Sequence, residues 1–247
     1  MTERPAIEVI RPQWAAPAHV QALSTTRAGG VSRGHYASLN LATHVGDEPD
    51  AIARNRAHLK NALNLPGEPC WLTQTHGTVL IEARRYPTPP EADACFCVRP
   101  GQVCAILTAD CLPILLCDRR GETLLAVHAG WRGLLENIIT KALDALPIAR
   151  RDWLAWIGPG IGVEAYTVGT ELVARFCAQD AGNSACFVHG NDSIKANLPA
   201  LAERQLQRAG VTAVSRYEGC TAAESARFFS YRRQGITGRM ATLIWRQ

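Results

Sequence analysis

Three residues whose side chains can bind a metal ion or perform nucleophilic chemistry each lie where an apolar run meets a loop. Cys111 lies between two strongly apolar runs, His128 ends a third, and His76 lies between two further apolar stretches. Binding and catalytic groups are commonly placed where buried strands give way to loops. The pattern predicts that Cys111 and His128 lie at the ends of adjacent strands, with His76 in a similar setting.

Two kinds of chemistry are open to these residues. One thiolate and two imidazoles make a three-ligand set for catalytic zinc, which leaves a fourth position for water and lowers the pKa of that water to about 7. In the alternative, Cys111 is a nucleophile, His128 is its base, and backbone N–H groups of residues 130–133 form an oxyanion hole. Asp110 or Asp118 would then orient the imidazole. The residues alone leave both alternatives open.

Copper is a further candidate, because one cysteine with two histidines also resembles a blue-copper ligand set. Oxidases that hold several copper centres need many histidines. This chain has seven, and four of them are scattered upstream of His76. The chain therefore lacks the ligands of a multicopper oxidase, and any oxidation of phenols would be a secondary activity. If the three residues hold a metal, Zn²⁺ is the expected ion and Cu²⁺ is possible.

Length and composition indicate one domain spanning residues 1–247. A chain of 247 residues, 47% of them hydrophobic, can bury roughly 70–75% of its unfolded surface without disulfides or a structural metal. Its nine cysteines are an odd number, and its first residues lack the apolar core of a signal peptide. No apolar run approaches the ~18 residues of a membrane span. We expect a cytoplasmic protein without a membrane partner, whose other cysteines are small core residues.

The positive charge is mild and gives little sign of a nucleic-acid partner. The net charge is +4 and the isoelectric point is near 8.6, with lysines and arginines scattered along the chain. The densest basic segment, 227–239, interleaves arginines with Phe228, Phe229 and Tyr231 but matches no nucleic-acid-binding motif. We expect solvated arginines around a packed aromatic pair, and no nucleic-acid partner.

Periodicity indicates strands and helices in the order of an α+β fold. The loop at His128 is expected to lead from a buried strand into a helix N-terminus, whose backbone N–H groups face a bound ligand. The glycine-rich segment 158–162 is expected to be a loop. Strands and helices mix without strict βαβ alternation, which favours α+β over a doubly wound sheet. The expected strands include 20–26 and 153–157, and the expected helices are 49–63, 134–143, 170–178 and 195–209, the last ended by Gly210.

Short motifs along almost the whole chain resemble those of the YfiH/YlmD-type proteins. This family has been labelled polyphenol oxidase, laccase-domain protein and purine nucleoside phosphorylase. One departure is Val-Glu-Ala at 163–165, where family members often have a cysteine pair, and Glu164 has no assigned role. The matching segments are TRAGGVS (26–32), SLNL (38–41), HVGD (44–47), NR (55–56), QTHG (74–77), ADC (109–111), HAGWRG (128–133), IGPGIG (157–162), YTVG (166–169) and FFSYRR (228–233).

The resemblance implies a zinc site formed by His76, Cys111 and His128. It implies a layered α+β sandwich of mixed β-sheets flanked by helices, related to the catalytic domain of the cytotoxic necrotizing factors. It also implies phosphorolysis of adenosine, inosine and methylthioadenosine to the base and sugar 1-phosphate, with deamination of adenosine beside it. Deamination fits the known chemistry of zinc, which activates water for attack on a purine.

Phosphorolysis requires an anion site, and the candidate substrate-binding residues are Arg27, Asn40, Arg56 and Arg132 in or beside the matching segments. The implied partners are a purine nucleoside and phosphate, for a monomer or homodimer. Two other functions stay open. One is a cysteine-nucleophile amidase or deamidase that uses Cys111 and His128, and the other is a non-catalytic protein that binds a metal or a nucleoside.

Overall fold

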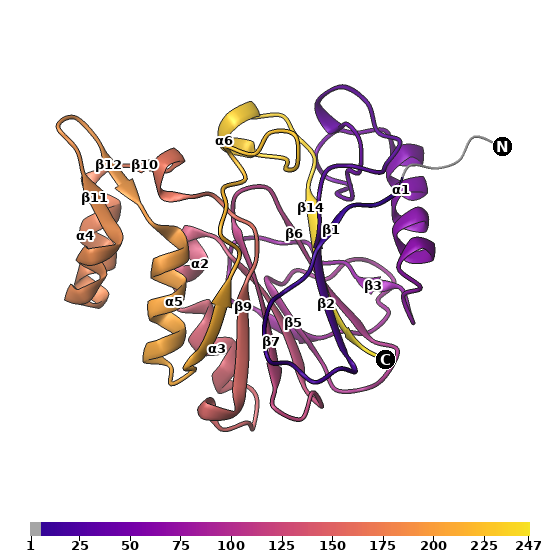
Figure 1. Cartoon of the computed structure of the whole chain (residues 1–247), viewed down its shortest axis with the longest axis horizontal. Coiled ribbons are helices and arrows are strands. Elements are labelled where there is room, and N and C mark those ends of the chain that lie inside the picture. The colour runs from indigo at the N-terminus through magenta and orange to yellow at the C-terminus, as the bar shows by residue number, and fades with distance from the viewer. Residues whose placement is uncertain (1–5) are drawn as a thin grey trace.

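Two β-sheets stack face to face at the centre of the molecule, and helices cover the outer face of each (Figure 1). The computed structural model describes residues 6–247. The expected α+β fold of layered mixed sheets flanked by helices is confirmed. Within the described residues, none of the helices combines the length and apolar character needed to cross a membrane.

The first sheet has the strand order β1-β2-β14-β6-β3. Its neighbours pair antiparallel except for β3 and β6, which are parallel, so the sheet is mixed. The C-terminal strand β14 lies between β2, from the N-terminal part of the chain, and β6, from its middle. The strands are β1 (Val9–Ile10), β2 (Val20–Thr25), β3 (Pro69–Cys70), β6 (Val103–Thr108) and β14 (Met240–Arg246).

The second sheet has the strand order β13-β9-β7-β8-β5-β4 and is also mixed. Its central strands β7, β8 and β9 are buried along their whole length, as their continuous apolar sequences require. The strands are β4 (Leu80–Glu82), β5 (Ala94–Cys97), β7 (Leu112–Asp118), β8 (Leu124–Ala129), β9 (Trp153–Ile157) and β13 (Ala213–Arg216).

Alternating side chains of these strands divide the interior into three apolar layers. Ile114 and Leu116 of β7 face the helices, whereas Leu115 and Cys117 face the other sheet. The period of two along a strand produces this division. Several cysteines fill the space between the sheets, where Cys104 is fully buried, and the nine cysteines, all within residues 6–247, are free. The prediction that the other cysteines are small core residues is confirmed for Cys104 and Cys117, but it is wrong for Cys177 and Cys220, which are only partly buried.

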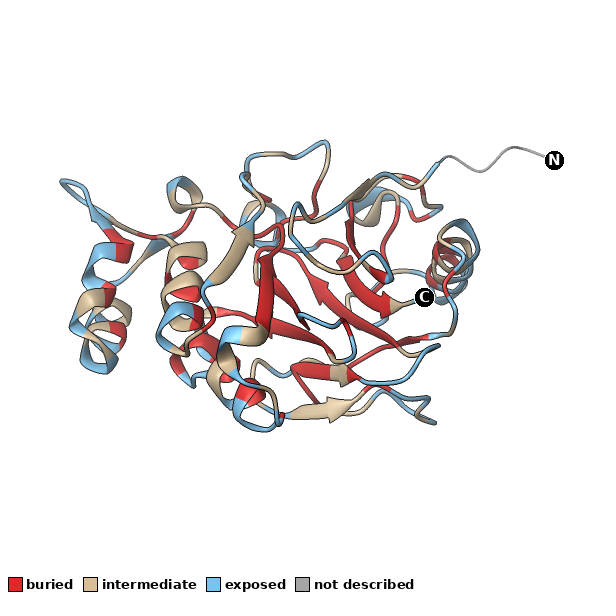
Figure 2. Cartoon of the chain, turned by 60° about the horizontal axis from the view of Figure 1, so that its bottom comes forward, coloured by how far each residue is buried: buried red, intermediate tan, exposed pale blue. Residues whose placement is uncertain are grey.

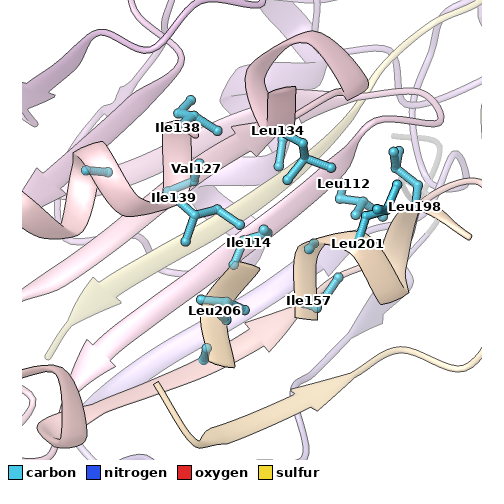
Figure 3. Packing of buried hydrophobic residues seen from close by; sticks show 14 of the residues in the cluster. Leu112, Ile114, Val127, Leu134, Ile138, Ile139, Ile157, Leu198, Leu201 and Leu206 are labelled. Atoms are coloured by element: carbon cyan, nitrogen blue, oxygen red, sulfur yellow. The ribbon is translucent and has the colours of Figure 1, made fainter. Parts of the chain in front are cut away.

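Helices cover the second sheet on one side and the first sheet on the other. Leu134, Ile138 and Ile139, together with leucines of α5, pack onto Ile114 and neighbouring side chains of the sheet (Figure 3). The buried residues gather in the stacked sheets, and the helices keep exposed outer faces (Figure 2). The α-helices are α1 (Pro49–Ala62), α2 (Trp131–Leu135), α3 (Ile138–Asp144), α4 (Thr170–Gln179), α5 (Leu198–Arg208) and α6 (Tyr231–Gln234).

A small antiparallel sheet and α4 extend from one side of the molecule (Figure 1). Glu164, which had no assigned role, forms an ion pair with Lys195 at this sheet. The strands are β10 (Thr167–Val168), β11 (Phe187–His189) and β12 (Ile194–Ala196), and the 3₁₀ turns are η1 (Gly34–Tyr36), η2 (Arg150–Asp152), η3 (Val163–Ala165) and η4 (Ala181–Cys186).

Two predicted helices differ from the structure. The segment 134–143 is not one helix, because Asn137 adopts a left-handed conformation (φ 60°) between α2 and α3. The helix expected over 195–209 starts later, because Asn197 accepts a hydrogen bond from the Ala200 N–H and caps α5. Its predicted end is confirmed, since Gly210 has a φ of +88° directly after the C-cap residue.

Candidate metal centre and active site

Strand pairing brings Cys111 and His128 together. Strands β7 and β8 are antiparallel, with Leu112 opposite Ala129, so Cys111 precedes β7 beside the end of β8. The prediction that the two residues lie at the ends of adjacent strands is confirmed. His76 reaches the same place from the loop between β3 and β4, where its backbone has a positive φ of 63°.

The thiol and the two imidazoles form a cluster of the size that a metal ion needs. Their ligand atoms all lie within 4.8 Å of one another, and Cys111 Sγ lies 3.8 Å from His76 Nε2. Ligands about 2.0–2.3 Å from a tetrahedral zinc ion are roughly 3.5 Å apart, so a small contraction suffices. A thiolate with two imidazoles is a donor set suited to zinc or copper. The residues present therefore fit a metal ion.

Gly130 allows this close approach. A Cβ atom at this position would lie 3.0 Å from Cys111 Sγ and 3.1 Å from the Cδ2 atom of His76. Both distances are shorter than ordinary carbon contacts. The lack of a side chain at Gly130, between β8 and α2, thus leaves room for the thiol and the ring to approach each other.

Asp93, which lies just before β5, holds both histidines in place. Its Oδ1 atom lies 2.7 Å from Nδ1 of His128 and accepts from the His76 backbone N–H at 2.9 Å. Its Oδ2 atom accepts from the backbone N–H groups of Thr75 and Gly77. Because an ionised carboxylate only accepts, Nδ1 of His128 carries the proton, which leaves Nε2 as the metal-binding nitrogen.

The expectation that Asp110 or Asp118 orients the imidazole is wrong. Asp110 accepts hydrogen bonds from the Thr221 and Ser230 hydroxyls and from the Arg232 N–H, which fixes the backbone before Cys111 at a φ of 93°. Asp118 accepts hydrogen bonds from backbone N–H groups of the turn between β7 and β8. This turn lies at the end of the two strands that is farther from the cluster. Neither carboxylate is hydrogen-bonded to a cluster histidine.

The charges within the cluster shift the pKa values of its members. Burial opposes ionisation of Cys111, but the imidazoles of His128 and His76 outweigh it and lower the pKa of the thiol to about 6. Burial also opposes protonation of His128, but the Cys111 thiolate and the Asp93 carboxylate raise its pKa to about 9. The protein thus stabilises a thiolate at neutral pH, the form in which cysteine binds metals and reacts.

Two neighbouring cavities share His76 and Cys111 in their lining, and we describe them as two chambers of one cavity. The first, of about 320 Å³, is lined by His44, Gln74, Thr108 and Arg239, and we call it the cationic chamber. The second, of about 250 Å³, contains Trp131, Ile161 and Tyr166, and we call it the aromatic chamber. Both include His76, Ala109, Cys111, Arg132 and Tyr231. Concave sites of this kind suit a small ligand that bridges polar and apolar surfaces.

Larger cavities lie elsewhere and contain none of the cluster residues. One, of about 610 Å³, is lined by the loops around Arg33 and Asp47. Another, of about 500 Å³, lies beside Lys60 and Arg84. The thiolate and imidazoles, rather than the volume, make the cavity at the cluster the candidate functional site.

Of the four predicted substrate-binding residues, the structure brings Arg132 alone to the cavity, where its guanidinium stacks 4.5 Å from the Trp131 ring centre. Arg27 donates to the carbonyls of residues 37 and 225, and its guanidinium lies over the ring of Phe229. Arg56 donates to a carbonyl and lies over Trp71. Asn40 is fully buried and binds backbone groups.

The remaining lining residues come from segments that sequence reasoning gave other roles or none. Phe228 and Phe229 are fully buried, as expected of the aromatic pair in segment 227–239. The arginines of this segment are not simply solvated, because Arg233 donates to three carbonyls and Arg239 lines the cavity. His44, Gln74, Tyr166 and Tyr231 lie within the matching family motifs, so those motifs could have indicated them as site residues. Asp93 lies outside them and had no such signal.

Comparison with known proteins shows the family of this chain. The family model described as multi-copper polyphenol oxidoreductase laccase matches residues 21–247. The chain belongs to this family. The family's description refers to several coppers, yet within residues 6–247 one group of three His, Cys, Asp or Glu ligand atoms is close enough together to hold an ion. That group is His76, Cys111 and His128, and it can bind one metal.

Relatives and solved structures of the family are similar over almost the whole chain. The purine nucleoside phosphorylase YfiH of Shigella flexneri is 44% identical over 239 residues, which cover 96% of this chain and 98% of the relative. A crystal structure of a Neisseria meningitidis protein has a TM-score of 0.92 and 42% identity, covering 97% of this chain and 99% of the other. YlmD from Geobacillus stearothermophilus has a TM-score of 0.87 and 30% identity, covering 97% and 100%.

Proposed function

We propose that this protein is a metal-dependent purine nucleoside phosphorylase. In this proposal it cleaves adenosine, inosine and methylthioadenosine with phosphate, and it also deaminates adenosine. The observation that supports it best is the cluster of Cys111, His76 and His128 between a chamber rich in cationic donors and a chamber rich in aromatic rings. The name of the Shigella flexneri relative, a purine nucleoside phosphorylase, supports the same activity.

In the proposed site, His76 Nε2, Cys111 Sγ and His128 Nε2 hold the metal, with Zn²⁺ preferred and Cu²⁺ as the alternative. A bound ion supplies Lewis acidity, which stabilises negative charge that develops on the substrate. The chain's own contribution is geometric: Asp93 keeps the proton on Nδ1 of His128, and Gly130 leaves room for the thiol beside the ring of His76. These contacts set the donors in place before substrate arrives.

The aromatic chamber is suited to the purine base. Trp131, Ile161 and Tyr166 provide apolar and aromatic surface beside the cluster. Burial, and then the charge of Cys111, raise the pKa of Tyr166 to about 12, so its hydroxyl keeps its proton at neutral pH and can donate a hydrogen bond to a base nitrogen.

Phosphorolysis in this cavity exchanges one bond for another at C1′ of the ribose. A phosphate oxygen forms a bond to C1′ while the bond from C1′ to N9 of the purine breaks. The electron pair of the broken bond leaves with the base, which takes up a proton from solvent. The cavity must therefore hold phosphate on one side of the ribose and the base on the other, and two chambers that share part of their lining suit this arrangement.

Incubation with adenosine and phosphate, followed by chromatography, tests the proposal. We expect adenine and ribose 1-phosphate from phosphorolysis, and inosine and hypoxanthine where deamination precedes it. Cys111→Ala removes one ligand atom from the cluster and serves as the comparison. If the wild-type protein forms no more of these products than Cys111→Ala, the proposed function is wrong, and a protein that binds a nucleoside or metal without turnover is the better description.

A second candidate, a cysteine-nucleophile amidase or deamidase, is favoured by one observation. Cys111, His128 and Asp93 have the order of a nucleophile, its base and an orienting carboxylate, with a thiol pKa of about 6. The second imidazole, His76, 3.8 Å from the thiol, has no role in such a triad but completes a metal site. Amide hydrolysis that survives chelation and is lost on alkylation of the thiol would support this candidate over the first.

A further inference from the structure

The cationic chamber is suited to an anion by both its charges and its donors. Arg132 and Arg239 line it together with His44 and Gln74, and no aspartate or glutamate of the described chain is among its lining residues. The two guanidinium groups outnumber the single thiolate of Cys111 in this lining, so the chamber keeps a positive charge that favours a bound anion.

Arg239 is held firmly but retains donors for a ligand. Its Nη1 atom donates to the carbonyls of Thr237 and Gly238, at 2.9 and 3.0 Å. Its Nε and Nη2 atoms have no partner within residues 6–247. The side chain lies mainly out of solvent, and burial lowers its pKa, opposed by the charges of Cys111 and Asp110. A guanidinium fixed on one edge and open on the other is prepared to bind an oxyanion at little entropic cost.

Asn40 links Arg239 to the loop that carries His44. The Asn40 Oδ1 atom accepts from the backbone N–H groups of Arg239 and Ala42, both within 3.1 Å. Its amide donates to the Ala42 carbonyl and to Asp47. Asn40 was predicted to bind substrate, but in the structure it joins the two segments that supply the donors of the chamber. These segments, around His44 and Arg239, are far apart in the sequence.

His44 adds a neutral donor at the rim of the chamber. Partial burial, followed by the charges of Arg239 and Arg56, lowers its pKa, so the imidazole is uncharged at neutral pH and donates one N–H. Thr108 lines the same chamber, and its buried hydroxyl has no hydrogen-bond partner within the described residues. Buried hydroxyls are seldom left unpaired, which fits a ligand oxygen in this chamber.

We propose that Arg239 and His44 form the phosphate subsite of this cavity, with Arg132 at its mouth. This inference rests on the proposed phosphorolysis and replaces Arg27 and Arg56, whose guanidinium groups are engaged with carbonyls and aromatic rings elsewhere. Arg239 takes two phosphate oxygens through its free edge, and His44 donates to another. The phosphate is then positioned on the opposite side of the cluster from the aromatic chamber.

Initial rates of inosine phosphorolysis at varied phosphate test this subsite. We expect Arg239→Met to raise the KM for phosphate about tenfold or more, because a charge-assisted hydrogen-bond pair is lost, and to change the KM for inosine by less than about twofold. The KM for phosphate of Arg239→Lys should lie between those of the wild-type protein and Arg239→Met. The KM for phosphate of His44→Gln, which keeps an N–H donor, should be closer to the wild-type value than that of His44→Ala. An unchanged KM for phosphate in both Arg239 variants would overturn the inference.

Two further measurements separate this inference from the proposed function. Zinc binding requires no phosphate, so Arg239→Met should keep the zinc content of the wild-type protein. Arg85→Met is the matched control, because Arg85 is exposed and lies outside the cavity. If the wild-type protein shows no phosphate-dependent turnover, the proposed function is wrong. Calorimetric titration with inorganic phosphate alone then tests whether the phosphate subsite exists. Binding by wild type and by Arg85→Met but not by Arg239→Met supports it, and equal binding by all three refutes it.

Discussion

Replacing Asp93 with asparagine should weaken metal binding while keeping the side-chain volume. Each oxygen of Asp93 accepts from at least two donors: the His76 N–H and His128 Nδ1 on one, and groups of Thr75 and Gly77 on the other. Whichever way the amide is turned, its NH₂ group faces at least two donors. Each buried donor left without an acceptor costs about 1–3 kcal/mol, so two cost about 2–6 kcal/mol.

This cost should appear in both stability and metal affinity. For a chain of this size, 1 kcal/mol shifts the Tm by roughly 2–4 °C, so the Tm of Asp93→Asn should fall by at least about 4 °C. Because Asp93 orients His128 directly, zinc affinity should fall about 10- to 100-fold. A thermal melt gives the first value, and competition with a chromophoric zinc chelator gives the second.

Asp118→Asn is the control for this prediction. Asp118 is also buried and also accepts from backbone N–H groups, but at the turn between β7 and β8 rather than at the cluster. Its replacement should lower the Tm and leave the zinc affinity within about twofold of wild type. If Asp93→Asn binds zinc as tightly as Asp118→Asn does, the assignment of Asp93 as the residue that orients the ligands is refuted.

Two other predictions concern the cluster itself. Gly130→Ala places a Cβ 3.0 Å from Cys111 Sγ and 3.1 Å from the His76 ring, so zinc affinity should fall about tenfold or more. Gly169→Ala, which meets nothing within 4 Å, is its control, and equal chelator-competition curves would contradict the prediction. In zinc-free protein, the alkylation rate of Cys111 should rise with pH to a plateau, with a midpoint near pH 6, because the thiolate predominates above its pKa of about 6. Mass spectrometry follows this rate, and a midpoint near the ordinary value of about 8.5 would show that the imidazoles do not stabilise the thiolate.

The sequence predicts the fold well where hydrophobic patterning determines structure. The apolar runs around Cys111 and His128 form β6, β7 and β8, and the segment 153–157 is β9. Hydrophobic patterning predicts helix boundaries less well where a single residue sets the boundary. Asn137 divides the helix expected over 134–143, and Asn197 delays the start of α5 by capping it.

The residues that complete the site are harder to predict, because tertiary pairing brings them together. Asp93 is 35 positions from His128 in sequence, and the pairing of β5 with β8 places them side by side. Arg239 reaches the cavity because β14 enters the first sheet between β2 and β6. The sequence pointed to Asp110 and Asp118 as the residues that orient the imidazole, but their hydrogen bonds fix other loops. Proximity in sequence is a poor guide to the partner of a buried histidine.

The most direct test of a metal-dependent nucleoside phosphorylase at His76, Cys111 and His128 is the rate of phosphate-dependent hypoxanthine release from inosine as zinc is removed and restored. We expect the rate to fall to the level of Cys111→Ala when chelation has removed the metal. Added zinc should restore it in the wild-type protein but not in Cys111→Ala. Undiminished hypoxanthine release by protein shown to be free of metal would contradict the account.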